Sequence, residues 1–270
     1  MNTATAPAKI NLALVVGPRR PDGKHEVATV LQRIDLTDSL SLEPAAALTV
    51  TGFEGDTLVT RALEELAAAA GVEPGWAVRI DKRIPVAAGL AGGSSDAATA
   101  LRLANESLPE PLLPDRLSTI AATIGADVPF FLTERPQLGT GDGTELRPLD
   151  LPLGYHVVLL LPERESKSST AAVYEAFDRR GGEAGFETRR AGLQRALESV
   201  AAPRDLRSLP RNDLASSPLA ERLEGLGAFR ADASGAGPAV YGLFEREQDA
   251  AYAATELQSL GATWVCAPTW

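Results

Sequence analysis

Residues 84–96 form a glycine-rich stretch that reads Ile84-Pro85-Val86-Ala87-Ala88-Gly89-Leu90-Ala91-Gly92-Gly93-Ser94-Ser95-Asp96. Upstream, residues 76–81 alternate apolar and polar side chains, which is typical of a half-buried strand. Downstream, residues 97–104 combine strong helix propensity with the absence of any helix breaker. The sequence therefore predicts a strand, a loop and a helix in succession, with Ser94 or Ser95 as the N-cap of the helix.

The composition of this loop is typical of a phosphate site. Glycines let the backbone approach a ligand closely and adopt positive φ, and the first N–H groups of a helix lack intrahelical partners. Those N–H groups and the helix dipole attract anions, most often phosphate. A tight turn is the simpler explanation of an isolated glycine pair, because Gly and Ser favour turns. Three glycines, two serines and an alanine-rich helix directly after them favour the phosphate site.

Two common nucleotide motifs do not match the loop. A Walker loop needs a lysine next to its last glycine, and no lysine lies between Lys82 and Lys167. A dinucleotide fingerprint needs G-x-G-x-x-G, which the glycine spacing here does not give. The loop is therefore a phosphate-site candidate of another kind.

The composition limits the classes of protein to be considered. A chain of 270 residues suits one large or two modest domains, and a net charge of -10 argues against a nucleic-acid surface. Cys266 is the only cysteine, so an intrachain disulfide is excluded and a reducing compartment fits. Residues 1–8 lack the apolar segment of a secretion signal, and no apolar run approaches the roughly 20 residues of a membrane span. We expect a cytoplasmic protein.

Near the N-terminus, residues 8–16 alternate in the manner of a strand, so Lys9 and Asn11 share one face. A solvated lysine at a sheet edge is the usual explanation of such a residue. Further strands are predicted at residues 25–34, 38–42 and 48–51, and a helix at residues 57–70.

Asp127 follows the third predicted helix of this half, which begins with Asp115 as its cap and ends at Ile124. An aspartate in that position is usually a turn residue. Here Val128-Pro129-Phe130-Phe131 come directly after it and form an apolar wall that would partly desolvate the carboxylate. The sequence therefore leaves two roles for Asp127, a turn residue or a proton acceptor.

The second half of the chain has an α+β pattern. A glycine-rich hairpin at residues 138–149 precedes a buried strand at residues 155–161. Helices at residues 169–179 and 188–200 and a short one from Leu219 follow. Two strands around the tight turn 234–238, a helix at residues 248–260 and a strand at residues 263–266 complete the chain. This order predicts a split βαβ domain.

Three motifs, in this order, resemble those of the GHMP kinases: residues 7–12, 85–95 and 234–238. The resemblance covers most of the chain. It implies an α+β fold of two domains, a ribosomal-S5-like ATP-binding domain over residues 1–150 and a ferredoxin-like substrate domain over residues 151–270. It also implies ATP and Mg²⁺ as cofactors and transfer of the γ-phosphoryl group to an alcohol.

The resemblance assigns roles to individual residues. Lys9 and Asp127 match the catalytic pair: Asp127 would accept the hydroxyl proton, and Lys9 would lie nearby and stabilise the developing oxyanion. The ATP-binding loop of the family corresponds here to Pro85, Val86, Ala87, Ala88, Gly89, Leu90, Ala91, Gly92, Gly93, Ser94 and Ser95. The third motif keeps its two glycines, Gly235 and Gly237. Ser95 is the candidate Mg²⁺ ligand.

Further matches, at residues 22–26, 125–130, 139–149, 169–174 and 212–214, imply an acceptor alcohol that carries a cytidine diphosphate group. His25 matches a residue that holds the cytidine base, and Asn11 one near the polar tail of the substrate. Thr170 and Tyr174 match the substrate side, where Tyr174 takes the place of one stacking aromatic. Lys24 stands where the family usually has the other aromatic, and Ala236 and Ala239 replace hydroxyl residues of the third motif.

Two alternatives remain open. Another kinase of this superfamily, for mevalonate or homoserine, is favoured by Lys24 but opposed by the stretches 125–130 and 212–214. A non-catalytic ligand-binding homologue is opposed by the presence of both Lys9 and Asp127. Neither a nucleic-acid nor a membrane partner is expected, and the protein is expected to be a monomer or a homodimer.

Overall fold

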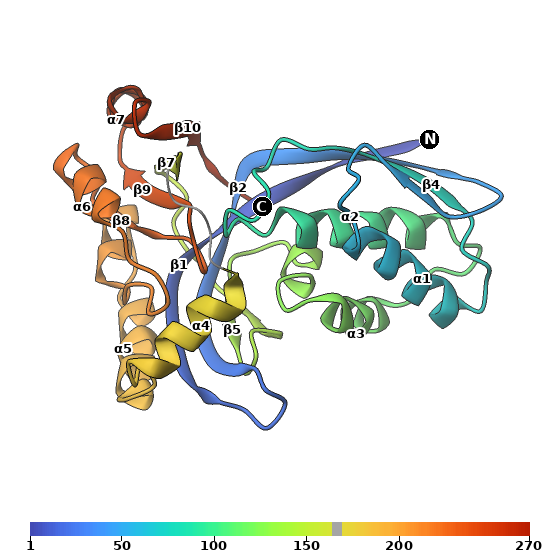
Figure 1. The fold of residues 1–270 in the computed structure, drawn as a ribbon, viewed down its shortest axis with the longest axis horizontal. Coiled ribbons are helices and arrows are strands. Elements are labelled where there is room, and N and C mark those ends of the chain that lie inside the picture. The colour runs from blue at the N-terminus through green and yellow to red at the C-terminus, as the bar shows by residue number, and fades with distance from the viewer. Residues whose placement is uncertain (164–168) are drawn as a thin grey trace. The chain divides into compact units, whose positions relative to one another are not determined.

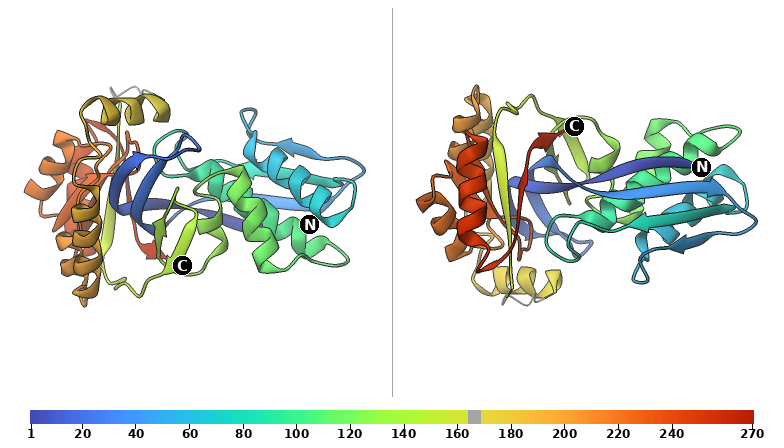
Figure 2. Two further views of the ribbon diagram at one scale, coloured as in Figure 1. Left: turned by 90° about the horizontal axis from the view of Figure 1, so that it is seen from below. Right: turned by 90° about the horizontal axis from the view of Figure 1, so that it is seen from above.

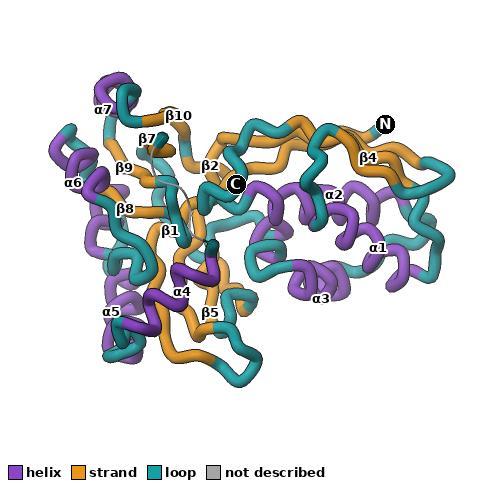
Figure 3. The backbone as a smooth tube through the Cα atoms, viewed as in Figure 1, coloured by secondary structure: helices purple, strands orange, loops and turns teal. Residues whose placement is uncertain are grey.

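The computed structural model describes residues 1–163 and 169–270 (Figure 1). The described chain divides into two compact units. Unit 1 contains residues 1–8, 36–86 and 91–134, and unit 2 contains residues 9–35, 87–90 and 135–270. Two long strands, β1 (Asn2–Arg19) and β2 (His25–Pro44), each contribute residues to both units (Figure 3).

The prediction of two strands at residues 25–34 and 38–42 is wrong, because β2 is continuous. The polar residues between them do not end the strand, since Asp35 has backbone partners. Its N–H donates to the carbonyl of Ala267 at 3.0 Å, and its carboxylate accepts the N–H of Ala267 at 2.9 Å. The strand β11 (Pro268–Thr269) pairs with the preceding residues of β2.

Unit 1 combines strands with helices. Strand β4 (Trp76–Asp81) pairs antiparallel with residues 39–44 of β2 and parallel with β3 (Thr49–Thr51). The bounds of β4 are those that the sequence predicts. The helical elements of this unit are α1 (Leu58–Ala70), α2 (Gly92–Ser107), α3 (Pro114–Ile124) and the 3-10 helix η1 (Pro129–Leu132).

Both predicted N-caps in unit 1 are wrong. Helix α2 begins at Gly92, with Ala91 as its N-cap and without a side-chain cap, so Ser94 and Ser95 lie inside the first turn. The reason is the left-handed conformation of Ala91, at φ 55°, which turns the chain into the helix three residues before the first serine. Helix α3 begins at Pro114 rather than after Asp115, because proline suits the first helical position.

In the described part of unit 2, a four-stranded antiparallel sheet has the order β10-β7-β9-β8. Helices α6 (Pro218–Gly225) and α7 (Glu247–Leu257) cover one face of this sheet, as Figure 2 shows. The strands are β7 (His156–Pro162), β8 (Arg230–Ala233), β9 (Val240–Phe244) and β10 (Gly261–Cys266). Strand, helices, two strands, helix and strand follow in that order, so the predicted split βαβ layout is confirmed.

The remaining elements of unit 2 pack beside its part of β2. The predicted glycine-rich hairpin is confirmed as β5 (Gln137–Thr140) and β6 (Glu145–Pro148), and β5 pairs antiparallel with residues 29–31. Helix α4 (Thr170–Arg179) places Phe177 against apolar side chains of β1 and β2. Helix α5 (Phe186–Glu198) and the 3-10 helix η2 (Pro203–Ser208) precede α6. Among the described residues, every helix is too short or too polar to cross a lipid bilayer.

Candidate active site

Lys9 is buried on β1, with 3% of its surface exposed. Its ammonium donates a hydrogen bond to Asn11 Oδ1 at 2.6 Å, so the prediction that the two side chains share a face is confirmed. Asn11 in turn donates to Thr29 Oγ1 at 2.8 Å, and this hydroxyl donates to the carbonyl of Ala13. A buried lysine held by a chain of hydrogen bonds is not a solvated edge lysine, so that alternative is wrong.

The first half of the glycine-rich loop lies beside Lys9 in unit 2. The N–H of Lys9 donates to the carbonyl of Leu90 at 3.1 Å. The carbonyl of Gly89 accepts the hydroxyl of Ser234 at 2.9 Å, and the carbonyl of Ala88 accepts the N–H of Ala239 at 3.0 Å. Residues 87–90 are therefore hydrogen-bonded to the two other motifs, the one around Lys9 and the one around Ser234.

Two glycines make this arrangement possible. Gly89 has φ +87°, and a Cβ there would lie under 3.0 Å from the carbonyl oxygen of Ser234. Gly235 has φ +56°, and a Cβ there would lie 3.5 Å from both Lys9 Nζ and Asn11 Oδ1. The structure thus brings Lys9, Asn11, Gly89 and Gly235 together within unit 2, with Gly237 (φ +70°) in the same turn as Gly235.

The second half of the loop belongs to unit 1 and opens helix α2. The N–H of Ser95 is the first that bonds back to the loop, to the carbonyl of Ala91 at 3.0 Å. The preceding N–H groups of a helix have no intrahelical acceptor. Ser95 is fully buried, and among the described residues its hydroxyl has no hydrogen-bond partner. An orphaned hydroxyl beside open N–H groups fits a phosphate or a phosphate-bound cation.

A buried cluster of one lysine and two aspartates, which the sequence does not reveal, contacts the residues before the loop and the first turn of α2. Lys82 Nζ donates to Asp38 Oδ2 at 2.5 Å and to Asp96 Oδ2 at 2.7 Å. Asp38 Oδ1 also accepts the N–H groups of Arg83 and Ile84, at 2.6 and 2.8 Å. Strand β2, the residues before the loop and the first turn of α2 are therefore tied together within unit 1.

Gly92 is close to the same cluster. A Cβ at Gly92 would lie 3.2 Å from Lys82 Nζ and 3.0 Å from Ile84 Cγ2, while one at Gly93 would lie 3.2 Å from Leu58 Cδ1. These two glycines therefore allow close packing inside unit 1, in addition to any approach of the backbone to phosphate.

The cluster makes a pH-dependent prediction. Two buried carboxylates share one ammonium, and burial raises the pKa of Asp96 to about 7, against the opposing effect of Lys82. The folded protein then binds a proton that the unfolded chain releases above pH 3.8, so wild-type stability falls as pH rises from about 4 to about 7. We expect Asp96→Asn, which keeps an oxygen acceptor for Lys82, to remove this fall: relative to wild type, its Tm rises by several degrees between pH 5 and pH 8. Thermal melts across that range measure the difference.

Asp38→Asn is the matched control for Asp96→Asn. It weakens an acceptor of three hydrogen bonds, so it lowers Tm at every pH in the range. If Asp96→Asn and wild type show parallel pH profiles, Asp96 does not titrate in this window.

Asp127 is half-buried in unit 1, between the end of α3 and η1. The side chains that follow it, Val128 and Phe130, are fully buried, and Phe131 is 8% exposed. The apolar wall predicted from the sequence is therefore present. Lys9 lies in unit 2 and Asp127 in unit 1, so their pairing stays a prediction.

The residues assigned to the acceptor lie in unit 2. His25 Nε2 is 2.7 Å from Asp178 Oδ1, and the His25 ring stacks on Tyr174 with centroids 4.7 Å apart. Lys24 Nζ is 2.5 Å from Asp142 Oδ2, and this ion pair with the hydrogen bonds from Thr144 lowers the pKa of Asp142 to about 2. Thr170 is the exposed first residue of α4. Asp142 and Asp178 are contacts that no local pattern in the sequence indicates.

The chain matches known proteins over nearly its whole length. The model of the GHMP kinases N terminal domain matches residues 57–135, and that of the GHMP kinases C terminal matches residues 196–263. A protein of Geobacter sulfurreducens is 39% identical over 272 residues, 94% of this chain and 94% of that protein. One of Nocardia farcinica is 38% identical, over 95% of this chain and 89% of that protein. The chain therefore belongs to the GHMP kinases.

Within this family, both relatives carry the name 4-diphosphocytidyl-2-C-methyl-D-erythritol kinase. A solved structure of 4-(cytidine 5'-diphospho)-2C-methyl-D-erythritol kinase has 33% sequence identity and a TM-score of 0.80, and the match covers 100% of both chains. A mevalonate kinase structure has a TM-score of 0.77 at 15% identity, which shows the shared fold alone. The predicted two-domain GHMP-kinase fold is confirmed, and the protein is a kinase that uses ATP as its phosphate donor.

Proposed function

We propose that this kinase transfers the γ-phosphoryl group of ATP to a hydroxyl of 4-(cytidine 5'-diphospho)-2-C-methyl-D-erythritol, in the non-mevalonate route to isoprenoid precursors. The observation that carries the proposal is the buried Lys9 ammonium, held by Asn11 and placed against the glycine turns at Gly89 and Gly235. The names of the relatives supply the acceptor.

The chemistry divides between positioning and charge. The open N–H groups at the start of α2 and the loop backbone bind the ATP phosphates. Asp127 accepts the proton of the attacking hydroxyl, and Lys9 stabilises negative charge on the transferred group. Because phosphoryl transfer has a loose transition state, these groups act mainly by holding the reactants and neutralising charge.

We also propose Mg²⁺ as the companion of ATP. Among the described residues, no group of three or more His, Cys, Asp or Glu side chains could hold a metal ion. These residues therefore suit a cation that is bound mainly by the ATP phosphates, and the buried Ser95 hydroxyl would be its protein ligand. When bound, Mg²⁺ would neutralise charge on the phosphate oxygens.

The acceptor side of the proposal rests on unit 2. His25, placed by Asp178 and stacked on Tyr174, recognises the cytidine base. Asn11 lies toward the polar tail of the substrate, and Thr170 contributes from α4.

We retain as proposals a domain boundary between residues 150 and 151, a cytoplasmic location, and a monomeric or homodimeric state without nucleic-acid partners.

A coupled ADP-release assay on a panel of alcohols tests the proposed function. The panel contains the cytidine diphosphate alcohol, mevalonate and homoserine, with and without Mg²⁺. We expect turnover with the first compound alone. Turnover with mevalonate or homoserine would show that the proposed acceptor is wrong. An absence of ADP release with every compound would contradict the proposed catalytic activity.

A different acceptor alcohol is the second candidate, and Lys24 is the observation in its favour. An aromatic ring at this position would supply ~1–3 kcal/mol of stacking on a base. Lys24 offers only its alkyl stem, and its ammonium is bound to Asp142.

Two substitutions decide between the acceptors. We expect Tyr174→Ala to raise KM for the cytidine substrate ~10-fold, equivalent to ~1.4 kcal/mol, because a stacking face is lost. We expect Lys24→Tyr to lower the same KM by supplying the second face. Steady-state kinetics measure both, with KM for ATP unchanged in each variant. Tyr252→Ala is the matched control, since Tyr252 is 59% exposed on α7. If neither KM moves, the cytidine assignment is wrong and the broader kinase assignment stands.

A further inference from the structure

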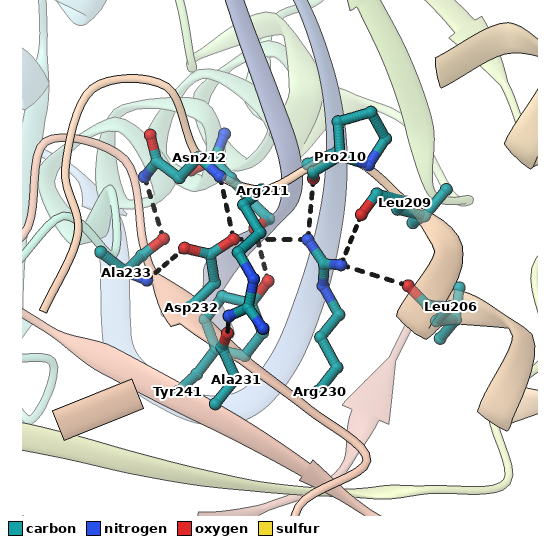
Figure 4. Close-up of polar contacts among 12 residues, drawn as sticks. Leu206, Leu209, Pro210, Arg211, Asn212, Arg230, Ala231, Asp232, Ala233 and Tyr241 are labelled. Carbon is teal, nitrogen blue, oxygen red and sulfur yellow. Dashed lines mark hydrogen bonds and ion pairs between the residues drawn. The ribbon is translucent and has the colours of Figure 1, made fainter. Parts of the chain in front are cut away.

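A buried polar network joins residues 206–212 to strand β8 (Figure 4). Arg230 is 3% exposed, and its guanidinium donates to the carbonyls of Leu209 and Pro210 at 2.6 and 2.8 Å. It also pairs with Asp232 at 3.3 Å, and Asp232 accepts the N–H of Asn212 at 2.9 Å. This network fixes the backbone of Asn212 against β8.

The side chain of Asn212 is 8% exposed and fully hydrogen-bonded. Its Nδ2 donates to the carbonyl of Ala233 at 3.0 Å and to that of Gly235 at 2.6 Å. Its Oδ1 accepts the N–H of Leu214 at 2.8 Å and that of Ala215 at 3.4 Å. Two carbonyls on one side and two N–H groups on the other use the whole capacity of an amide and allow a single orientation.

Gly235, whose carbonyl accepts the hydrogen bond from Asn212, is next to Lys9. A Cβ at Gly235 would lie in van der Waals distance of Lys9 Nζ, at 3.5 Å, and of the Gly89 carbonyl, at 3.4 Å. Asn11 Oδ1 accepts a hydrogen bond from the same ammonium, and the Asn11 carbonyl accepts the Tyr241 hydroxyl of β9 at 2.9 Å. The turn at Gly235 therefore forms one wall of the space that Lys9 occupies.

We infer that Asn212 is a positioning residue for catalysis: by holding the carbonyl of Gly235, it keeps the 234–238 turn against the Lys9 ammonium and the Gly89 carbonyl. Asn212 acts through Lys9 and need not touch substrate or ATP. The inference rests on the proposed catalytic role of Lys9, and the test below separates the two.

Asn212→Asp is the sharpest variant because it keeps the shape of the side chain. One carboxylate oxygen still accepts from Leu214 and Ala215, but the other faces two carbonyl oxygens and repels them. We expect kcat to fall at least 10-fold at pH 8, with KM for ATP and for the alcohol within twofold of wild type. A protonated carboxyl at 212 can donate to Gly235, so the ratio of mutant to wild-type kcat should rise at least threefold from pH 8.5 to pH 6.

Several charged groups surround position 212: Asp232 and Arg230 on β8, Arg211 and Asp213 beside it in the chain, and Lys9 beyond Gly235. Asp213→Asn is the matched control. Asp213 accepts the N–H of Val16 at 2.9 Å and pairs with Arg189 at 3.1 Å, away from the turn. We expect this control to lower Tm while leaving kcat within twofold of wild type at each pH.

A double-mutant cycle with Lys9→Ala provides the decisive readout. Lys9→Ala alone should lower kcat at least 100-fold; if it does not, the proposed role of Lys9 fails, whatever Asn212 does. If Lys9→Ala has that effect, Asn212→Asp should lower kcat less than twofold further in the Lys9→Ala background. An equal fall in both backgrounds, or an unchanged kcat in the single variant, overturns the inference.

Gly235→Ala keeps the inference testable if Asn212→Asp does not fold. The added methyl group meets its neighbours at ordinary contact distances, so folding should survive the strain of φ +56°. The strain shifts the turn relative to the Lys9 ammonium, so we expect kcat to fall at least fivefold with unchanged KM for ATP. Wild-type kcat in folded Gly235→Ala would show that the turn does not position Lys9.

Discussion

Asp127→Asn should lower kcat by at least ~10²-fold, which is the usual scale for loss of a general base. The affinity for ATP should stay nearly unchanged. A carboxamide cannot accept the hydroxyl proton, whereas the proposed phosphate-binding groups in the glycine-rich loop and at the start of α2 are untouched. The fold should also survive, because the buried wall of Val128 and Phe130 does not depend on the charge of residue 127.

Rapid-quench or steady-state assays give kcat, and calorimetry gives the ATP affinity. Asp115→Asn is the control, because it removes the same charge from an exposed position in the first turn of α3. Turnover of Asp127→Asn near the wild-type rate would remove Asp127 from the mechanism and leave Lys9 and the loop as the catalytic groups.

Gly89→Ala should destabilise the protein by about 3 kcal/mol or more, from the left-handed backbone and from overpacking together. Gly89 has φ +87°, and the new methyl group would lie closer to the Ser234 carbonyl oxygen than real Cβ contacts allow. For a chain of this size we expect a fall in Tm of roughly 6–10 °C. The displaced loop should also bind ATP more weakly.

Gly71→Ala is the control that separates the cost of the left-handed backbone from the cost of overpacking. Gly71 caps α1 at φ +68°, and a Cβ there would meet nothing within 4 Å. It therefore carries the cost of the left-handed backbone alone, about 1–2 kcal/mol. Thermal melts of both variants measure the difference. Equal losses of Tm would mean that the close approach of Gly89 to Ser234 contributes nothing.

The elements that the sequence predicts well are those with strong periodicity and clear ends. Helix α1 is predicted at residues 57–70 and observed at Leu58–Ala70, since its apolar face is regular and Gly71 ends it. The split βαβ order of the C-terminal half follows from the succession of short apolar runs. The three motifs identify the family by their residues and order along the chain, and the second and third retain the glycines that their backbone turns need.

The failures have physical causes that local patterns do not contain. The N-cap of α2 is missed because an alanine rarely adopts the left-handed conformation that Ala91 has here. The Lys82 cluster is missed because Asp38 is 44 residues away and reaches Lys82 only through sheet pairing. The burial of Arg230 is equally hidden, since it depends on the carbonyls of residues 209 and 210, which follow the 3-10 helix η2.

Strands β1 and β2, which run through both units, set a limit on protein dissection. Unit 2 is assembled from three separate stretches of chain, so no single cut releases it as a contiguous fragment. A cut after residue 150 would leave Lys9, Asn11 and Gly89 on one fragment and Ser234 and Gly235 on the other, although the Ser234 hydroxyl donates to the Gly89 carbonyl. The two halves of this kinase would therefore be fragments for complementation, in which phosphotransfer reports their reassembly, rather than modules to be exchanged independently.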